Sequence, residues 1–331
     1  MAERYDAILI LSFGGPERTE DVLPFLENVT RGRGIPRERL MGVAEHYYHF
    51  LGKSPINDQN RLLIGALEKE LAEYGPQVPV YWGNRNWHPL LADTLREMEA
   101  AGVRRALAFV TSVFSSYSGC RQYLEDIERA RAAVGPGAPE IHKLRTFYNH
   151  PGFIEPMAER VRAARAELPA SRLFFTAHSI PLSMARTCGY EGQLEEACRL
   201  VAEHAGCPDW RLVYQSRSGA PGQPWLEPDV LDALRELPYG AGVILAPIGF
   251  ISDHMEVLYD LDTEARELCD QLGLKMVRAG TVGVHPKFIS MIRDLINERM
   301  GKAQPLAIGN FGPSHDVCAA DCCPAPERRP A

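Results

Sequence analysis

Short apolar runs alternate with amphipathic stretches along most of the chain. Six runs have the length of a strand and end in glycine, proline or polar clusters, namely 7–11, 78–82, 106–111, 172–176, 211–214 and 243–247. Helical spacing follows most of them, which is typical of a parallel α/β sheet. Because the scheme occurs twice, we expect two lobes, residues 1–150 and 151–303, with their strand exits facing one cleft. The tail, residues 304–331, has no helical period.

The most informative stretch follows the last of these runs. A helical pattern is expected from Asp253 onward, and Glu256, Asp260 and Glu264 recur at intervals of four. On an α-helix this spacing forms one row of carboxylates, which repel one another. The row is either a solvated acidic face or a path for a divalent cation. His254 lies at the strand-to-helix junction, where open α/β sheets bind ligands, and favours the cation.

Composition excludes several classes of protein. The chain has 331 residues, 45% of them hydrophobic, and a net charge of −7, which argues against a general nucleic-acid binder. No segment approaches the ~20 apolar residues of a membrane span, and the N-terminus does not resemble a signal peptide. We therefore expect a soluble, cytoplasmic protein without integral membrane contact. Its eight cysteines indicate thiols or metal ligands rather than disulfides.

Several separated motifs together resemble one family. They are LSFGGPE, SPIN, NRNWHP, FTAHSIP, QSRSG with PWLEPDV, and GFISDHMEVLYDLD, in this order between Ile8 and about Met300. The sequence is similar to the ferrochelatases, lyases that insert ferrous iron into a porphyrin in haem biosynthesis. This resemblance implies a chelatase-like α/β fold of two Rossmann-like lobes, each with a parallel sheet flanked by helices, and a porphyrin held in the cleft between them.

The resemblance also implies roles for individual residues. His178 and Glu256 match the catalytic histidine and carboxylate that handle the Fe²⁺ substrate, and we expect them to converge from different lobes. Asp260 and Glu264 match an outer divalent-ion site. The implied substrate-binding residues are Phe13, Arg31, Ser54, Arg85, Tyr117, Gln215, Ser216, Trp225, Asp253 and His254. Phe13 stands where some bacterial members carry an iron-ligating tyrosine, so iron must be held from the side of His178 and Glu256.

The chemistry needs a proton acceptor, because two pyrrole N–H protons leave as iron enters. Histidine suits that task near neutral pH, but whether His178 is base or ligand stays open. Arg31, Arg33 and Lys53 lie on loops that we assign to the cleft mouth. The basic stretch TRGRGIPRERL favours coproporphyrin III, with four propionates, over protoporphyrin IX, with two. The alternatives are a non-catalytic tetrapyrrole or metal carrier and a cobalt or nickel chelatase.

The cysteines of the tail indicate a metal centre. Cys318, Cys322 and Cys323 lie within six residues, and Cys120 follows the Tyr117-Ser118-Gly119 motif. By resemblance to ferrochelatases that bind a [2Fe–2S] cluster, we expect these four cysteines to hold one, with Cys188 as the reserve ligand and the tail tied to the first lobe. Zinc and a redox-active thiol group are the alternatives. Cys198, Cys207 and Cys269 are expected to be buried. A monomer or weak dimer is expected.

Overall fold

The structure is a computed structural model that describes residues 4–32, 34–218 and 222–326. The chain divides into two compact units. Unit 1 comprises the residues up to Thr111 together with Tyr123–Leu144 and Arg299–Lys302. Unit 2 comprises Ser112–Gln122, Arg145–Glu298 and the tail from Ala303 onward.

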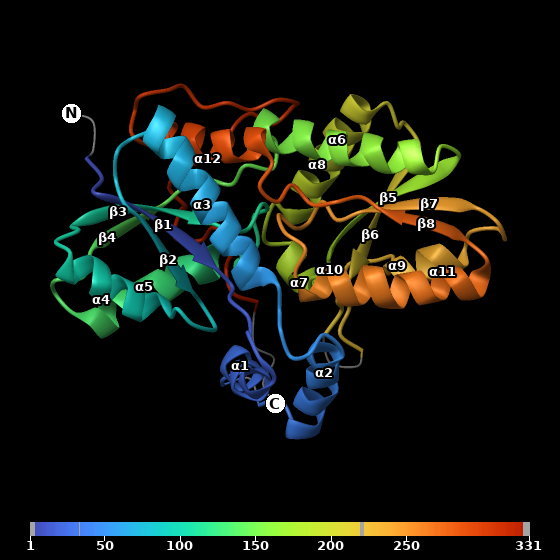
Figure 1. Ribbon diagram of the computed structural model, residues 1–331, viewed down its shortest axis with the longest axis horizontal. Helices are drawn as coiled ribbons and strands as arrows, with labels where there is room; N and C mark the ends of the chain where they lie inside the picture. The colour runs from blue at the N-terminus through green and yellow to red at the C-terminus, as the bar shows by residue number, and fades with distance from the viewer. Residues whose placement is uncertain (1–3, 33, 219–221, 327–331) are drawn as a thin grey trace. The chain divides into compact units, whose positions relative to one another are not determined.

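Unit 1 is built on a parallel sheet with the strand order β2-β1-β3-β4 (Figure 1). Its strands are β1 (Ala7–Ser12), β2 (Val80–Asn84), β3 (Arg105–Val110) and β4 (Glu140–Lys143). Its helices are η1 (Thr19–Asp21), α1 (Val22–Val29), α2 (Arg37–His49), α3 (Ile56–Tyr74), α4 (Leu91–Ala100) and α5 (Gln122–Val134). Every residue of β1 is buried, as expected for a parallel strand covered on both faces. Leu9, Leu95 and Ile127 join the sheet, α4 and α5 in one core.

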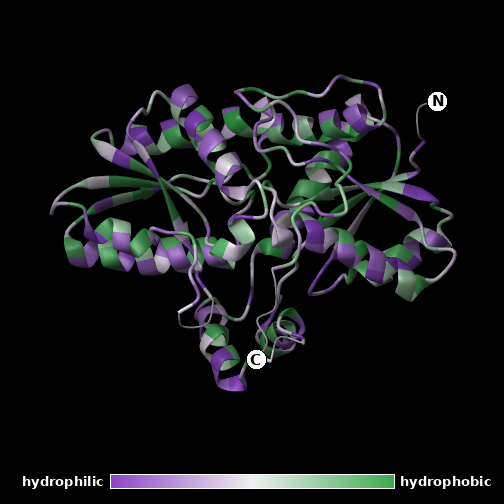
Figure 2. Cartoon of the chain, turned by 180° about the vertical axis from the view of Figure 1, so that it is seen from behind, coloured by the Kyte–Doolittle hydropathy of each residue, from purple (hydrophilic) through white to green (hydrophobic). Residues whose placement is uncertain are grey.

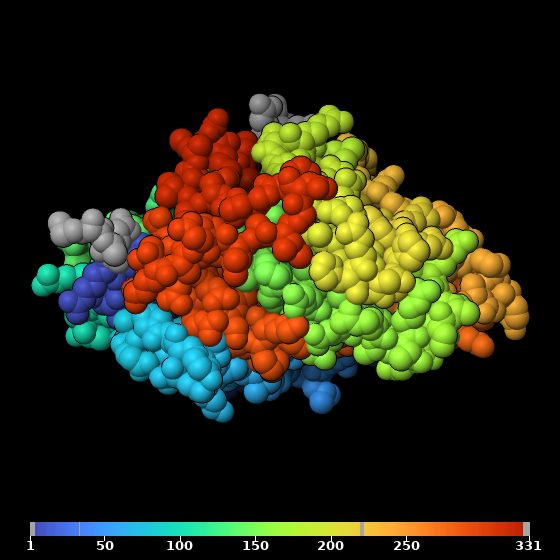
Figure 3. Space-filling model, turned by 90° about the horizontal axis from the view of Figure 1, so that it is seen from above, coloured from blue at the N-terminus to red at the C-terminus, as the bar shows by residue number. Residues whose placement is uncertain are grey.

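Unit 2 repeats this topology with the strand order β6-β5-β7-β8. Its strands are β5 (Ser171–His178), β6 (Trp210–Gln215), β7 (Gly242–Ala246) and β8 (Lys275–Arg278). Its helices are η2 (Tyr117–Arg121), α6 (Pro151–Glu167), α7 (Leu182–Ala185), α8 (Tyr190–Ala205), α9 (Val230–Arg235), α10 (Met255–Val257), η3 (Leu258–Ala265), α11 (Arg266–Leu272) and α12 (Pro286–Arg299). Helices α6 and α8 lie side by side (Figure 3), and the strands are largely hydrophobic (Figure 2).

The six strands expected from the apolar runs are all present, but each sheet has a fourth strand that the pattern did not reveal. β4 and β8 are four residues long, read EIHK and KMVR, and lie at sheet edges. A strand of four residues with a charged residue at each end contains no apolar run of strand length, so its sequence signal is weak. Helices α6 and α8 were likewise not assigned from the sequence.

The acidic helix differs from its expected form. The pattern predicts an α-helix from Asp253, whereas Leu258–Ala265 forms the π-helix η3 between α10 and α11. A π-helix has more residues per turn than an α-helix. A step of four residues slightly exceeds one turn of an α-helix and falls slightly short of one turn of a π-helix, so residues four apart lie near one face in both. The carboxylate row therefore survives the change of helix type.

The shared strand order fixes where each unit can bind a ligand. In unit 2 the chain runs from β5 to β6 on one side and returns to β7 on the other side of β5. A ligand crevice forms at the carboxyl ends of strands where the order reverses in this way. The ends of β5 and β7 are therefore the expected place for a site. No helix in the described part of the chain has both the length and the apolarity that a membrane span needs.

Candidate functional site

The carboxyl end of the unit 2 sheet brings three chain segments together. β5 ends at His178, which pairs in register with Gln215 at the end of β6. The segment after β7 approaches β5 closely, because the Gly249 amide donates to the Thr176 carbonyl at 3.0 Å. A Cβ atom at Gly249 would lie 2.7 Å from the Ala177 Cα, so only glycine permits this approach. The turn then leads into α10, which carries Glu256.

His178 has a fixed tautomer. Its Nδ1–H donates to the Ser179 carbonyl, which can only accept a hydrogen bond. In the neutral ring, Nε2 therefore carries the lone pair, and it lies 3.7 Å from Glu256 Oε1. The side chains of His178 and Glu256 are 33% and 44% exposed, so both remain accessible to a substrate. The Tyr190 hydroxyl, which the sequence analysis missed, donates to the His178 carbonyl at 2.9 Å and holds the strand end in place.

The distance between these two groups indicates what they can do. At 3.7 Å, Nε2 and Oε1 are too far apart for a hydrogen bond, which needs about 2.7–3.2 Å. Two acceptors that face each other at this distance suit a proton or a cation between or beside them. Both residues lie in unit 2, so the expectation that they come from different lobes is wrong. They come from adjacent strand exits of a single sheet.

Asp253 and His254 support this arrangement from the same turn. His254 Nδ1 accepts from the Glu256 amide at 3.2 Å and so caps α10. Burial lowers the pKa of His254, which agrees with an unprotonated, accepting Nδ1. Asp253 is bound by Arg278 Nη1 at 3.0 Å and by the Thr281 hydroxyl at 3.1 Å. These contacts fix the turn that positions Glu256.

The carboxylate row continues from Glu256 into η3. Ser216 donates its hydroxyl to Asp260 Oδ2, and Gln215 Nε2 donates to the same oxygen at 3.2 Å. Burial, with a contribution from the negative charges of Glu256 and Glu264, raises the pKa of Asp260 to about 7. Burial also raises the pKa of Glu264. The row is therefore partly desolvated rather than a fully solvated acidic face.

Two further substrate-binding candidates lie in unit 2. Tyr117 begins the π-helical turn η2. Trp225 is buried, and its Nε1 has no hydrogen-bond partner among the described residues. Ser216 has a positive φ of 61°, a backbone conformation that costs on the order of 1 kcal/mol outside glycine and often occurs at functional sites.

The candidates in unit 1 differ in how they are held. Phe13 is exposed and contacts Phe25 edge to face, and Arg31 is exposed after α1. Ser54 is buried before α3. The side chain of Arg85 is only 7% exposed, pairs with Asp126 and lies 3.6 Å from the centre of the Tyr123 ring. Arg33 lies outside the described residues. Lys53 pairs with Asp58 on the surface.

The predicted cysteine ligands form two sulfur pairs in unit 2. Cys120 Sγ lies 3.9 Å from Cys318 Sγ, and Cys322 Sγ lies 3.7 Å from Cys323 Sγ. All eight cysteines lie in the described part of the chain. Cys120 belongs to unit 2, so the tail is not tied to the first lobe as expected. Cys198, Cys207 and Cys269 are buried, which confirms the expectation for them.

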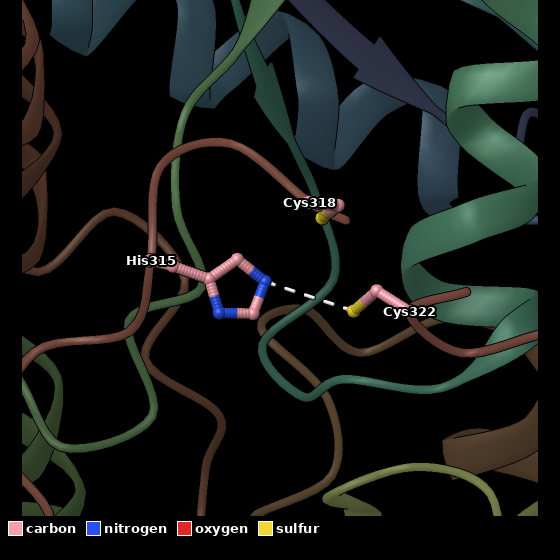
Figure 4. A group of neighbouring side chains, drawn as sticks. All are labelled: His315, Cys318 and Cys322. Atoms are coloured by element: carbon pink, nitrogen blue, oxygen red, sulfur yellow. Dashed lines mark hydrogen bonds between the residues drawn. The ribbon is translucent and has the colours of Figure 1, made fainter. Parts of the chain in front are cut away.

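Two residues of this cysteine group were not identified from the sequence. Arg121 donates from Nε to the Cys322 carbonyl at 3.0 Å and from Nη2 to the Ala320 carbonyl at 3.0 Å, so one guanidinium fixes the loop that carries the thiols. His315 lies beside Cys318 and Cys322 (Figure 4), and its donor atom is within 4.8 Å of theirs. His315 lies three residues before Cys318, outside the C-x₃-C-C spacing that predicted the ligands.

Comparison with known proteins decides the family. The ferrochelatase family model matches residues 5–300. The chain belongs to the ferrochelatase family. It is 57% identical to a ferrochelatase of Rhodopirellula baltica, with 98% of this chain and 95% of the relative covered. It is 52% identical to a coproporphyrin III ferrochelatase of Streptomyces coelicolor, with 100% and 96% covered, and 51% identical to one of Nocardia farcinica, with 98% of each chain covered.

Solved structures support the fold. The structure of the sirohydrochlorin chelatase SirB from Bacillus subtilis subspecies spizizenii, in complex with cobalt, aligns with a TM-score of 0.55 at 11% identity. The alignment covers 91% of this chain and 97% of that chain. At this identity the likeness concerns the fold alone, and it confirms a chelatase-like α/β architecture with a parallel sheet in each unit.

Proposed function

We propose that this ferrochelatase inserts Fe²⁺ into coproporphyrin III to form coprohaem III, with His178 and Glu256 as its catalytic residues. The observation that carries this proposal is the approach of His178 Nε2 to Glu256 Oε1 at 3.7 Å, at strand exits in a chain of this family. Relatives that are 51–53% identical over nearly the whole chain are coproporphyrin III ferrochelatases.

The reaction exchanges two pyrrole protons for one Fe²⁺ ion. His178 Nε2 accepts a proton or binds the metal, because the bond from Nδ1 to Ser179 leaves Nε2 as the basic nitrogen. Glu256 supplies a negative charge beside it, which stabilises either the imidazolium or the incoming cation. Distortion of the porphyrin exposes its nitrogen lone pairs, and remote contacts supply the roughly 1–5 kcal/mol that strain of this kind requires.

The carboxylates beyond Glu256 provide a route for the cation. Asp260 and Glu264 follow Glu256 along α10 and η3, and oxygen donors suit divalent ions. The raised pKa of Asp260, about 7, supports a group that exchanges a proton for a metal ion near neutral pH. We propose these two residues as the outer divalent-ion site.

The proposed preference for coproporphyrin III is inferred from the positive charge of the segment that follows α1. Arg31 is exposed there, and Arg37 and Arg39 follow at the start of α2. Cationic side chains favour a porphyrin with four propionates over one with two. The other proposed substrate-binding residues are those expected from the sequence in both units. A cytoplasmic location and a monomer or weak dimer stay predictions.

The test is a comparison of kcat/KM for coproporphyrin III and protoporphyrin IX with Fe²⁺, Co²⁺ and Zn²⁺. We expect Fe²⁺ insertion into coproporphyrin III with a preference of at least about tenfold, equivalent to about 1.4 kcal/mol. A preference for protoporphyrin IX would overturn the substrate assignment. Binding of porphyrin without turnover would favour a carrier, and turnover restricted to Co²⁺ would favour a different chelatase.

We also propose that the tail holds a [2Fe–2S] cluster on Cys120, Cys318 and Cys322, with a fourth ligand beside Cys322. The residues fit the group, since the Cys120–Cys318 distance of 3.9 Å is close to the roughly 3.8 Å between two thiolates at 2.3 Å on one tetrahedral ion. The sequence predicts Cys323 as the fourth ligand. When bound, such a cluster supplies one-electron chemistry and a cross-link for the tail. Arg121 orients the loop that presents its ligands.

A further inference from the structure

An imidazole lies among the thiols of the tail. His315 Nε2 is 3.6 Å from Cys322 Sγ (Figure 4). The donor atoms of His315, Cys318 and Cys322 all lie within 4.8 Å of one another. Cys120 Sγ is 3.9 Å from Cys318 Sγ, so a fourth donor adjoins this trio. Imidazole nitrogen and cysteine sulfur are donors that zinc and iron–sulfur centres both accept.

Cys322 therefore has two neighbours that compete for one coordination position. Cys323 Sγ lies 3.7 Å from Cys322 Sγ, and His315 Nε2 lies 3.6 Å from it. For ligands at 2.0–2.3 Å on one tetrahedral ion, the nitrogen–sulfur separation is about 3.6 Å. The distance to Cys322 Sγ is therefore compatible with either His315 or Cys323 as the fourth ligand.

The wider geometry favours His315. Its donor atom lies within 4.8 Å of the donor atoms of both Cys318 and Cys322. Cys323 is buried and has a positive φ of 51°, so its side chain is held by a backbone conformation that is unfavourable outside glycine. His315 is exposed, and a neutral imidazole binds a metal without first losing a proton.

We propose that His315 is a metal ligand, which binds through Nε2 beside Cys120, Cys318 and Cys322 and takes the position expected for Cys323. The proposal rests on the proposed metal centre of the tail and is independent of the iron-insertion activity. A centre with three thiolates and one imidazole carries one negative charge fewer than a centre with four thiolates. Replacement of thiolate by imidazole raises the reduction potential of a [2Fe–2S] cluster.

The experiment compares His315→Ala with Cys323→Ser in the full-length protein, purified without oxygen from iron-replete cells. Iron and zinc per chain, visible absorbance and resistance to a chelator are measured for both variants and for wild type. We expect His315→Ala to lose metal to the chelator at least about tenfold more readily than wild type, and Cys323→Ser to behave like wild type. Cys322→Ser, the positive control, should lose the centre.

A spectroscopic signature separates a ligand from a residue that only supports the loop. Wild type labelled with ¹⁵N-histidine should show a nitrogen hyperfine coupling in pulsed electron paramagnetic resonance of the reduced cluster, and His315→Ala should lack it. If the centre holds zinc instead, X-ray absorption should show one nitrogen and three sulfurs. His315→Cys should restore metal retention with an all-sulfur spectrum.

Three results would overturn the proposal: wild type without metal, a wild-type centre without a nitrogen ligand, or loss of metal from Cys323→Ser but not from His315→Ala. Circular dichroism and thermal unfolding of each variant identify a folding defect, and in that case the ¹⁵N signal of the wild type decides. Fe²⁺ insertion is assayed in the same preparations, so failure of the ligand proposal is distinguished from failure of the proposed enzymatic function.

Discussion

Units 1 and 2 share a topology but carry different chemistry at equivalent positions. In unit 1 the end of β1 pairs Ser12 with Asn84, and in unit 2 the end of β5 pairs His178 with Gln215. Ser12 and Asn84 are fully buried, whereas a third of His178 is exposed. The strand order thus determines where a ligand can bind, and the residues at the strand ends determine which reaction the site can support.

The two units also treat charge differently. In unit 1, Arg85 is neutralised by Asp126 and stacked on Tyr123. In unit 2, Asp260 accepts hydrogen bonds only from the uncharged side chains of Ser216 and Gln215 among the contacts described above, and burial together with the nearby carboxylates raises its pKa. A compensated ion pair stabilises a fold, while carboxylates gathered without such compensation attract a cation. Each prediction below tests one part of this contrast.

The largest expected effect is on kcat, and it should differ between variants at the ends of β5 and β1. His178→Ala should lower kcat for iron insertion by about 10²–10⁴, because it removes the group that we propose to accept a proton or bind the metal. Ser12→Ala, at the equivalent position of unit 1, should keep kcat within about threefold, since its buried hydroxyl has no hydrogen-bond partner among the described residues. Steady-state kinetics with coproporphyrin III measures both, and porphyrin binding by fluorescence quenching should persist in both. Near-normal turnover in His178→Ala would contradict the contrast.

The next effect concerns the stability of unit 1. The side chains of Arg85 and Asp126 are 7% and 9% exposed, and Asp126 also pairs with Arg129, so Asp126→Ala removes a buried anion that two guanidinium groups share. Asp126→Ala should lower the free energy of unfolding by about 3–5 kcal/mol in urea titrations, and Arg85→Ala should lower it by less, because Arg129 still pairs with Asp126. Arg61→Ala, which breaks exposed pairs with Asp58 and Glu17, serves as the control and should change the free energy of unfolding by less than about 1 kcal/mol. Unchanged stability in Arg85→Ala would favour a role in substrate binding over a structural one.

A smaller effect is expected on the pH dependence of the free energy of unfolding, and it comes from Asp260 in unit 2. The pKa of Asp260 is raised to about 7, whereas an aspartate in an unfolded chain has a pKa of about 4. Between these values the folded state binds more protons than the unfolded state, so this group lowers stability as pH rises from about 4 to about 7. Wild type should lose stability relative to Asp260→Asn across that window, by at most about 1.4 kcal/mol for each pH unit. Urea titrations at several pH values measure it, and parallel curves for the two proteins would contradict the raised pKa.

Much of this contrast could be predicted from the sequence. Apolar runs located β1–β3 and β5–β7, and the FTAHSIP and GFISDHMEVLYDLD motifs located His178 and Glu256. Strands β4 and β8 escaped because they are only four residues long and have a charged residue at each end. The π-helical form of Leu258–Ala265 escaped because residues four apart share a face in both helix types.

Contacts between distant segments escaped for a different reason. Tyr190 begins α8 but bonds the carbonyl at the end of β5, and Arg121 bonds carbonyls about 200 residues later in the tail. Both use backbone acceptors, which every residue carries, so no sequence pattern marks the partner. His315 lacked a signal because a single histidine outside the Cys-x₃-Cys-Cys spacing has no periodic relation to it.

The central claim is that His178 and Glu256 act as one unit in metal insertion, and a double-mutant cycle tests it most directly. Initial rates of Fe²⁺ insertion are measured at saturating porphyrin for wild type, His178→Ala, Glu256→Gln and the double variant. If the two groups act together across the 3.7 Å between them, the double variant should be within about threefold of the slower single variant. Losses that multiply, so that the double variant falls by the product of both single effects, would contradict the account.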